Sequence, residues 1–424
     1  MFTTFINAWK IKDVRRKLLF ALLLIAVYRL GSAIPLPGTN LHAWYHIRSA
    51  GTGQTLFSTI TGGGVGTIFM MGIGPFITAS IIMQLLTVAI PKLEQMQKEG
   101  EEGRKKINQI TKILTIVLAI VQGAGMVFTM THQARSLGGE FFNNPGMFTY
   151  VVATAAMVAG STFVMWMGEL ITEKGIGNGT SFIIFSNILA GVPSGILTLY
   201  SILLTPGVLH RIGLGFLIIA FAGLIAFAIL VQEGERRIPV QYSKKMVGRQ
   251  QYGGQSSYIP IKVNIAGVMS IIFAISIMQF PTMLAGFWSN PTLLRIADFL
   301  DIMSWSGAII YLVFIVVFTF FYTSFAVNPI EMAENMKKNG GFIPGIRPGK
   351  PTSDYIARTV HRLSTIGAGF YVLLAAIPIV FQWIFNVPIG FGGTTLLIVT
   401  GVALEIVKQV ESQLLMRHYK GFLS

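Results

Sequence analysis

Long apolar stretches alternate with short polar connections along the whole chain, and this alternation predicts membrane-spanning helices. A helix of about 20 apolar residues crosses the hydrocarbon core of a bilayer. Since lipid offers the backbone no hydrogen-bond partners, only helices or closed barrels span it. The stretches lie at about 18–36, 68–90, 113–131, 148–168, 180–203, 213–232, 263–283, 307–327, 366–385 and 393–410. The pattern predicts an all-α polytopic membrane protein with ten transmembrane helices.

The spans carry very few charges. Eight contain no Asp, Glu, Lys or Arg; the first holds Arg29, and the last holds Glu405 and Lys408 near its end. The basic cluster before the first span also fits the charged start of a signal peptide. We favour a retained span, because its apolar run is too long for a signal peptide and nine more spans follow.

Composition and charge placement fix the predicted orientation. The 424 residues are 53% apolar and only 12% charged, against about 25% charged in soluble domains, with no cysteine and a net charge of +15. A protein this apolar is not a nucleic-acid binder. With both termini in the cytoplasm, 27 Lys and Arg lie on the cytoplasmic side and five outside, as the positive-inside rule requires.

Loop lengths predict an internal repeat. Connections of about 31, 22, 16 and 11 residues separate the first five spans, and about 30, 23, 38 and 7 separate the last five. Because five is odd, the second copy is inserted upside down, as in many secondary transporters. We therefore expect two inverted five-helix halves, 1–205 and 206–424, around a central pore, with long cytoplasmic loops at about 233–262 and 328–365.

The chain contains no recognisable catalytic or cofactor motif. It lacks the zincin, serine-hydrolase, P-loop and EF-hand signatures, and its six histidines lie outside the membrane centre. We expect no enzyme activity, no metal and no cofactor. Eight charge-free spans also count against an ion-coupled carrier, which needs ionisable groups at mid-membrane depth. A small-molecule secondary transporter stays the alternative function.

Three polar or glycine-rich segments interrupt the apolar pattern. The first, at about 55–68, contains Gly62, Gly63 and Gly64 and is too short to span; it fits either a re-entrant half-helix or an outer surface loop. The other two are the basic cytoplasmic loops, which carry prolines, glycines and aromatics. Such loops act as topology determinants near anionic lipid or as recognition surfaces.

These segments and several motifs resemble the SecY family, the channel subunit of the Sec protein-conducting translocon. The resemblance covers nearly the whole chain. Its motifs are Tyr28–Gly31, Ile34–Gly38, Pro75–Leu86, Gly175–Gly179, the Glu-x-x-Arg-Arg-Ile sequence at 233–238, Lys262–Asn264, Phe342–Gly349 and Phe391–Thr394. The family's ten spans, cytoplasmic termini and inverted repeat match the pattern above.

The resemblance implies a site made of four parts. A narrow aliphatic pore ring corresponds to Ile77, Ile81, Ile184, Ile188, Ile277 and Ile398. A plug outside the ring corresponds to Phe57, Ile60, Gly62, Gly63, Gly64 and Val65. A lateral gate has polar contacts at Thr78, Gln122 and Asn264, which equally fit ordinary interhelical hydrogen bonds. Partner docking corresponds to Arg236, Arg237 and Arg347.

The resemblance also implies partners and a location. We expect a protein-conducting channel in the inner or plasma membrane that translocates unfolded secretory polypeptides and releases transmembrane segments into lipid. Expected partners are SecE-type and SecG-type subunits, the SecA motor ATPase, the ribosome, signal peptides and membrane lipid. Since the chain has no ATP-binding motif, the energy must come from a partner.

Overall fold

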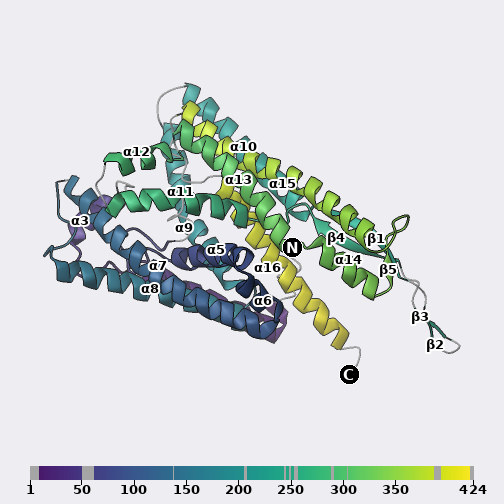
Figure 1. Ribbon diagram of the computed structural model, residues 1–424. Coiled ribbons are helices and arrows are strands. Elements are labelled where there is room, and N and C mark those ends of the chain that lie inside the picture. Colours follow the sequence, from purple (N-terminus) through teal and green to yellow (C-terminus); the bar gives the residue numbers. More distant parts are fainter. Residues whose placement is uncertain are drawn as a thin grey trace. The chain divides into compact units, whose positions relative to one another are not determined.

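The computed structural model describes residues 9–49, 62–136, 138–204, 208–242, 245–247, 250–252, 256–287, 291–302, 304–385 and 393–420. A helix overlaps each of the ten predicted spans (Figure 1). In chain order these are α2 (Lys12–Gly31), α5 (Gly74–Ala89), α7 (Glu101–Ser136), α8 (Met147–Lys174), α9 (Gly179–Leu204), α10 (Val208–Glu233), α11 (Met269–Phe287), α13 (Trp305–Ala326), α15 (Lys350–Phe385) and α16 (Gly393–Lys420).

The remaining elements lie in the connections. They are the helices α3 (Leu41–Ser49), α6 (Pro91–Lys98), α12 (Pro291–Phe299) and α14 (Pro329–Lys338), and the short strands β1 (Glu235–Tyr242), β2 (Lys245–Val247), β3 (Gln250–Tyr252), β4 (Ser256–Lys262) and β5 (Gly341–Phe342). The mainly helical class is as predicted, but the strands are not: both basic loops contain β structure.

Several helix ends differ from the predicted spans. The helix α5 begins at Gly74, six residues after the predicted start, because residues 65–73 form turns that include Gly66 and Gly72 with positive φ. At its other end, α5 meets α6 at an angle of 101° around Ile90 and Pro91. Two helices, α7 and α15, have 36 residues each, or about 54 Å at 1.5 Å per residue. They are therefore longer than the hydrocarbon core of a bilayer is thick, about 30 Å.

Length and apolarity qualify only some helices as spans. Within the described residues, four helices can cross a membrane, or five if the bent pair α5–α6 counts as one span. Three further apolar segments, Gly179–Pro193, Ile219–Glu233 and Met269–Pro281, are shorter. The number of ten crossings therefore stays a prediction.

The chain divides into two compact units. The first comprises residues 1–198, 276–301 and 402–424, and the second comprises residues 199–275 and 302–401. The boundary near 198 lies close to the predicted boundary at 205. The divisions at 275, 301 and 401 fall elsewhere, so the units are not the two predicted halves, which stay a prediction based on the loop lengths.

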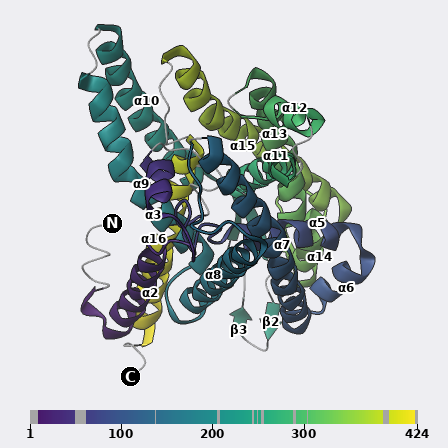
Figure 2. The same ribbon diagram turned by 90° about the vertical axis from the view of Figure 1, so that its left-hand side faces the viewer.

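In the first unit, α7 runs beside both α8 and α5 (Figures 1 and 2). A core of buried side chains joins α7 and α8 to the segments around residues 36, 65–71 and 141–142; its members are Leu36, Val65, Met70, Met71, Ala119, Val127, Met130, Ala134, Phe141, Phe142, Ala153 and Met157. This core holds the segment before α5 in place.

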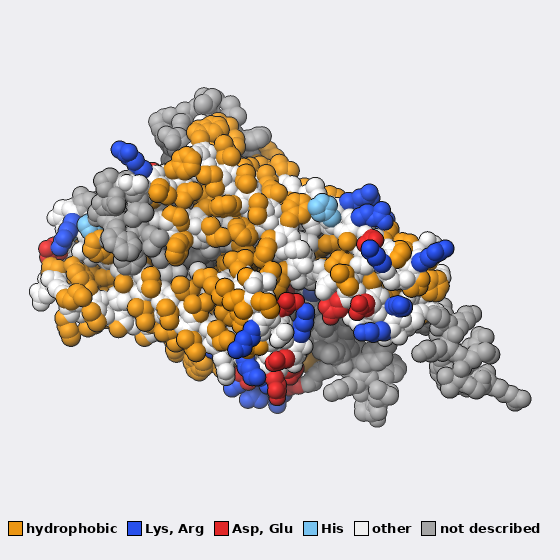
Figure 3. All heavy atoms as spheres, in the orientation of Figure 1, with side chains coloured by type: hydrophobic (Ala, Val, Ile, Leu, Met, Phe, Trp, Pro, Cys, Tyr) orange, Lys and Arg blue, Asp and Glu red, His pale blue; other side chains and the backbone are white. Residues whose placement is uncertain are grey.

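In the second unit, α13 packs along α15, which also contacts α14 and α10. Hydrophobic side chains cover much of the visible helix surface in Figure 3, and charged side chains gather around α6 and around β1 and α14. On α13, Ile309, Val313 and Val317 are each more than half exposed. Such a stripe fits a lipid-facing surface.

Candidate functional site

The six predicted ring isoleucines all lie on helices. Ile77 and Ile81 share one face of α5, and Ile184 and Ile188 share one face of α9, because residues four apart are neighbours on a helix. All four are buried in the first unit. On α11, Ile277 is 37% exposed, whereas Ile398 on α16 is buried in the second unit.

Of the predicted plug, the structure describes only residues from Gly62 onward; Phe57 and Ile60 lie outside the described residues. The described part forms turns and not a half-helix. The N–H of Gly63 donates to the carbonyl of Phe69 (2.8 Å), and the N–H of Ile68 donates to the carbonyl of Ile34 (3.1 Å).

Further contacts anchor this segment. The indole Nε1 of Trp44 donates to the carbonyl of Val65 (2.9 Å). A side chain at Gly66, where φ is +68°, would come within 2.6 Å of the Trp44 ring. Glycine is therefore required at position 66, by space and by conformation.

The three predicted gate residues differ in their bonding. Thr78 is half-buried and donates to the carbonyl of Gly74 in its own helix (3.1 Å). Gln122 is half-buried on α7. The carboxamide oxygen of Asn264 accepts a hydrogen bond from the hydroxyl of Tyr371 on α15. Within the described residues, Asn264 is the one of the three whose side chain bonds to a distant segment, and that bond lies within the second unit.

The predicted docking arginines lie on one small folded body, which we call the basic platform: β1, β4, β5, α14 and the first half of α15. Its antiparallel sheet has the order β4-β1-β5, so the second basic loop adds a strand to the hairpin formed by the first. Its own core is made of Ile238, Val240, Ile261, Met336, Ile343, Ile356, Val360 and Leu363.

The three proposed docking arginines of the basic platform are exposed. Arg236 and Arg237 follow each other on β1, and Arg347 lies in the turn before α15. Arg237 binds the carboxylate of Glu235 (2.7 Å) and lies over the ring of Tyr258. The hydrogen bond that Arg237 donates to the Glu235 carboxylate raises the pKa of Arg237.

Two intramembrane polar contacts were not among the predicted site residues. Arg29 on α2 donates to the hydroxyl of Ser186 on α9, and Gln232 on α10 donates to the carbonyl of Leu397 on α16. The sequence did contain a signal for the first, because Arg29 is the one charged residue within the first predicted span.

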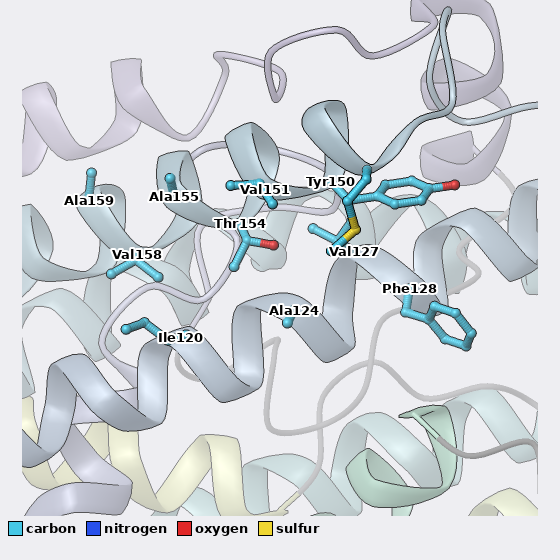
Figure 4. A pocket seen from close by; sticks show the side chains of 11 residues that line it. Ile120, Ala124, Val127, Phe128, Tyr150, Val151, Thr154, Ala155, Val158 and Ala159 are labelled. Atoms are coloured by element: carbon cyan, nitrogen blue, oxygen red, sulfur yellow. The ribbon is translucent and has the colours of Figure 1, made fainter.

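An apolar groove of about 620 Å³ lies between α7 and α8 (Figure 4). Small and branched side chains, among them Ala124, Ala155 and Ala159, line it together with Phe128 and Tyr150. The lining contains no charged group, so the groove offers apolar contact and no catalytic chemistry.

Comparison with known proteins decides the family. The model of the SecY family matches residues 67–407. A protein translocase subunit SecY from Aquifex aeolicus is 44% identical, with 98% of each chain covered, and that of Halalkalibacterium halodurans is 43% identical over both full lengths. The chain belongs to the SecY family.

The solved structures agree on the fold. A protein-conducting channel has a TM-score of 0.64 at 18% identity, with 94% of this chain and 92% of that one covered. A SecY protein whose plug domain stabilises the closed state of its channel has the same score at 19% identity, with the same coverage. Sec61 from a canine ribosome–channel complex scores 0.62 at 17% identity, covering 94% of this chain and 92% of that one. The SecY fold thus covers both units, and the expected family is confirmed.

Proposed function

We propose that this SecY-family chain is the pore-forming subunit of a Sec translocon. It passes unfolded secretory polypeptides outward across the membrane and releases transmembrane segments sideways into lipid. The observation that carries this function is the match to translocase subunits over the full chain at 43–44% identity. As a channel, it provides a path for the polypeptide and catalyses no reaction of its own.

The pore ring is proposed at Ile77, Ile81, Ile184, Ile188, Ile277 and Ile398. A narrow apolar constriction dewets and so blocks ions, while aliphatic side chains yield to a polypeptide that pushes through. Five of the six are well buried in the structure described, as tightly packed constriction residues would be in a resting channel.

The plug and the gate complete the proposed channel. The plug contains Phe57, Ile60, Gly62, Gly63, Gly64 and Val65; its glycines allow close packing and rearrangement at low steric cost. Thr78, Gln122 and Asn264 supply the polar contacts of the gate. Hydrogen bonds between membrane helices are worth only about 0.6 kcal/mol on average, which suits an interface that an apolar signal helix must open.

The exposed arginines and the lack of an ATP-binding motif in the sequence support the proposed partners. Arg236, Arg237 and Arg347 present guanidinium groups that suit acidic protein surfaces or RNA phosphate. We propose docking of a SecA-type ATPase or of the ribosome there, with SecE-type and SecG-type subunits beside the bundle. The charge asymmetry supports an inner or plasma membrane location with both termini in the cytoplasm.

Replacement of ring isoleucines tests the pore. Ile77, Ile184 and Ile277 changed together to Ser are expected to raise ion conductance through the reconstituted, resting complex, because hydroxyl groups keep the constriction wet. Ile277→Ser alone is a gentler variant, since its side chain is already 37% exposed and leaves a smaller cavity.

The matched control changes three isoleucines on the exposed surface, Ile113, Ile309 and Ile366, to Ser. This control should assemble and stay closed. Conductance equal to the wild type in both ring variants, at equal amounts of assembled complex, removes these residues from the constriction.

A further inference from the structure

Arg29 is held against α9 beside a proposed ring residue. Its Nε and Nη2 atoms lie 3.2 and 3.1 Å from the hydroxyl oxygen of Ser186, and Nη2 also lies 3.3 Å from the carboxamide oxygen of Asn187. Nη2 further donates to the main-chain carbonyl of Ser186. The next residue of α9 is Ile188. The guanidinium thus hydrogen-bonds to the backbone and side chain of Ser186 and to the side chain of Asn187, directly before the ring position.

Gln232 makes the corresponding contact in the second unit. Its Nε2 donates to the main-chain carbonyl of Leu397 (3.1 Å) and to the hydroxyl of Thr400 (3.3 Å) on α16. Ile398 lies between these two acceptors. A side chain at Gly401 would come within 3.2 Å of the same Nε2 atom, so α16 approaches Gln232 closely at a glycine.

The two contacts occupy the same place in the two predicted repeats. Arg29 lies in the last turn of α2, and Gln232 lies in the last turn of α10, the first helices of their repeats. Each reaches the fifth helix of its own repeat. Each is followed two residues later by a glycine that packs closely against another part of the chain. A side chain at Gly31 would collide with the Phe69 ring, and one at Gly234 would come within 3.2 Å of Val263.

Loss of either contact leaves a polar side chain without its acceptors. Among the described residues no carboxylate pairs with Arg29; its guanidinium lies over the Tyr28 ring and donates to the oxygens of α9. If α9 moved away, an unsatisfied guanidinium would remain in an apolar region. In the described part of the chain, the Gln232 amide group likewise donates only to Leu397 and Thr400. Each polar residue therefore resists displacement of the helix that it holds.

We propose that Arg29 and Gln232 are positioning residues that fix α9 and α16 at the level of Ile188 and Ile398 and so set how tightly the resting pore closes. This inference rests on the proposed channel function and on the proposed ring. Because each contact reaches a backbone carbonyl beside the ring position, it fixes the helix there and, through the helix, the place of the ring side chain.

Substitutions that keep size and remove donors test the proposal. Arg29→Met and Gln232→Leu are each expected to raise resting ion leak about three- to tenfold in the reconstituted complex, the range that one or two interhelical hydrogen bonds account for. Arg29→Lys keeps the charge and a donor and should restore most of the seal. Thr319→Val is the control, because Thr319 donates only within its own helix, to Ile315 (2.6 Å); its leak should equal the wild type.

A double-mutant cycle separates positioning from general stability. If Arg29 acts through Ile188, then Arg29→Met combined with Ile188→Gly should leak no more than Ile188→Gly alone. Gln232→Leu with Ile398→Gly should behave likewise. Additive leaks, or a wild-type leak in assembled Arg29→Met and Gln232→Leu, overturn the proposal. A wild-type leak in Ile188→Gly and Ile398→Gly overturns the ring instead.

If Arg29→Met assembles poorly, Gln232→Leu and its cycle with Ile398→Gly decide the matter. Thermal unfolding of each purified complex reports loss of stability independently of leak. A variant that unfolds earlier but keeps the wild-type leak identifies a merely structural residue and contradicts positioning.

Discussion

Single residues of α8 determine how closely the segment before α5 can approach. The hydroxyl of Ser161 donates to the carbonyl of Gly72 (3.0 Å). One residue earlier, Gly160 has no side chain, and a Cβ atom there would collide with the carbonyl oxygen of Ile68. Ser161 thus holds the segment that follows the proposed plug against α8 by a hydrogen bond, and Gly160 leaves the space that lets it come close.

Gly160→Ala is therefore expected to destabilise the protein by about 1–3 kcal/mol, because the added methyl group meets backbone that cannot rotate away. Thermal unfolding of the purified protein measures the effect. Gly223→Ala on α10 is the matched control, since nothing lies within 4 Å of its added Cβ; it should be neutral or slightly stabilising. Equal unfolding temperatures for the two variants would contradict the close approach at Gly160.

At this scale the sequence proposed site residues that lie in motifs, whose roles stay predictions, and missed the contact of Arg29 with α9. The positions of Ile77 and Asn264 follow from neighbouring motif residues. The partners of Arg29, by contrast, lie 157 and 158 residues away, and no local pattern connects them. Phe57 and Ile60 lie outside the described residues, so their plug role stays a prediction.

Among the elements, the basic platform differs most from expectation. The sequence predicted two exposed loops. In the first of them, however, the buried residues Ile238 and Val240 alternate with exposed ones, as in a strand with one buried face. Pro239 makes this strand hard to recognise, because proline donates no ladder hydrogen bond. β5 is harder still: Gly341 and Phe342 pair with Tyr242 and Gln241, about a hundred residues earlier.

A folded platform predicts that its arginines act as a fixed charged surface. Arg347→Glu should weaken docking of a SecA-type ATPase or of the ribosome about tenfold or more, and should reduce the salt dependence of binding, because one attractive charge becomes repulsive. Binding to the reconstituted channel at two salt concentrations measures this. The fold should survive, since Arg347 is exposed and the substitution keeps its main-chain carbonyl, which accepts a hydrogen bond from the hydroxyl of Thr352 (2.9 Å).

Lys338→Glu on α14 is the matched control, because it changes the net charge equally at an exposed position of the basic platform that is not one of the three proposed docking arginines. It should leave docking within about twofold of the wild type. Equal losses from Arg347→Glu and Lys338→Glu would indicate a general charge effect and would remove Arg347 from the docking site.

For the molecule as a whole, apolar stretches predicted where helices occur more accurately than where they end. The helices α7 and α15 continue past the predicted spans into charged sequence, because a helix satisfies its own backbone in water as well as in lipid. The helix α5, by contrast, begins later than predicted, because Gly66 and Gly72 before it adopt positive φ, which a helix does not allow. The loop lengths that indicated a repeat do not determine which helices cluster together, so the compact units cross the predicted boundary.

The ten crossings and the cytoplasmic termini make a prediction for the complete chain. Because the protein contains no cysteine, single cysteines report sidedness against an unlabelled background. Glu99→Cys and Ser257→Cys, at exposed positions between α6 and α7 and on β4, should react with an impermeant thiol reagent only from the cytoplasmic side. Gly146→Cys and Asp298→Cys, exposed before α8 and on α12, should react only from outside.

The four sites test different crossings, because they lie after the second, third, sixth and seventh spans. Gly146→Cys is sterically harmless, since nothing lies within 4 Å of its added Cβ. Labelling in intact cells is compared with labelling after the membrane is opened, and the unsubstituted protein should take up no reagent in either. If Glu99→Cys and Gly146→Cys react from the same side, the third span does not cross the bilayer; the same result for Ser257→Cys and Asp298→Cys would remove the seventh.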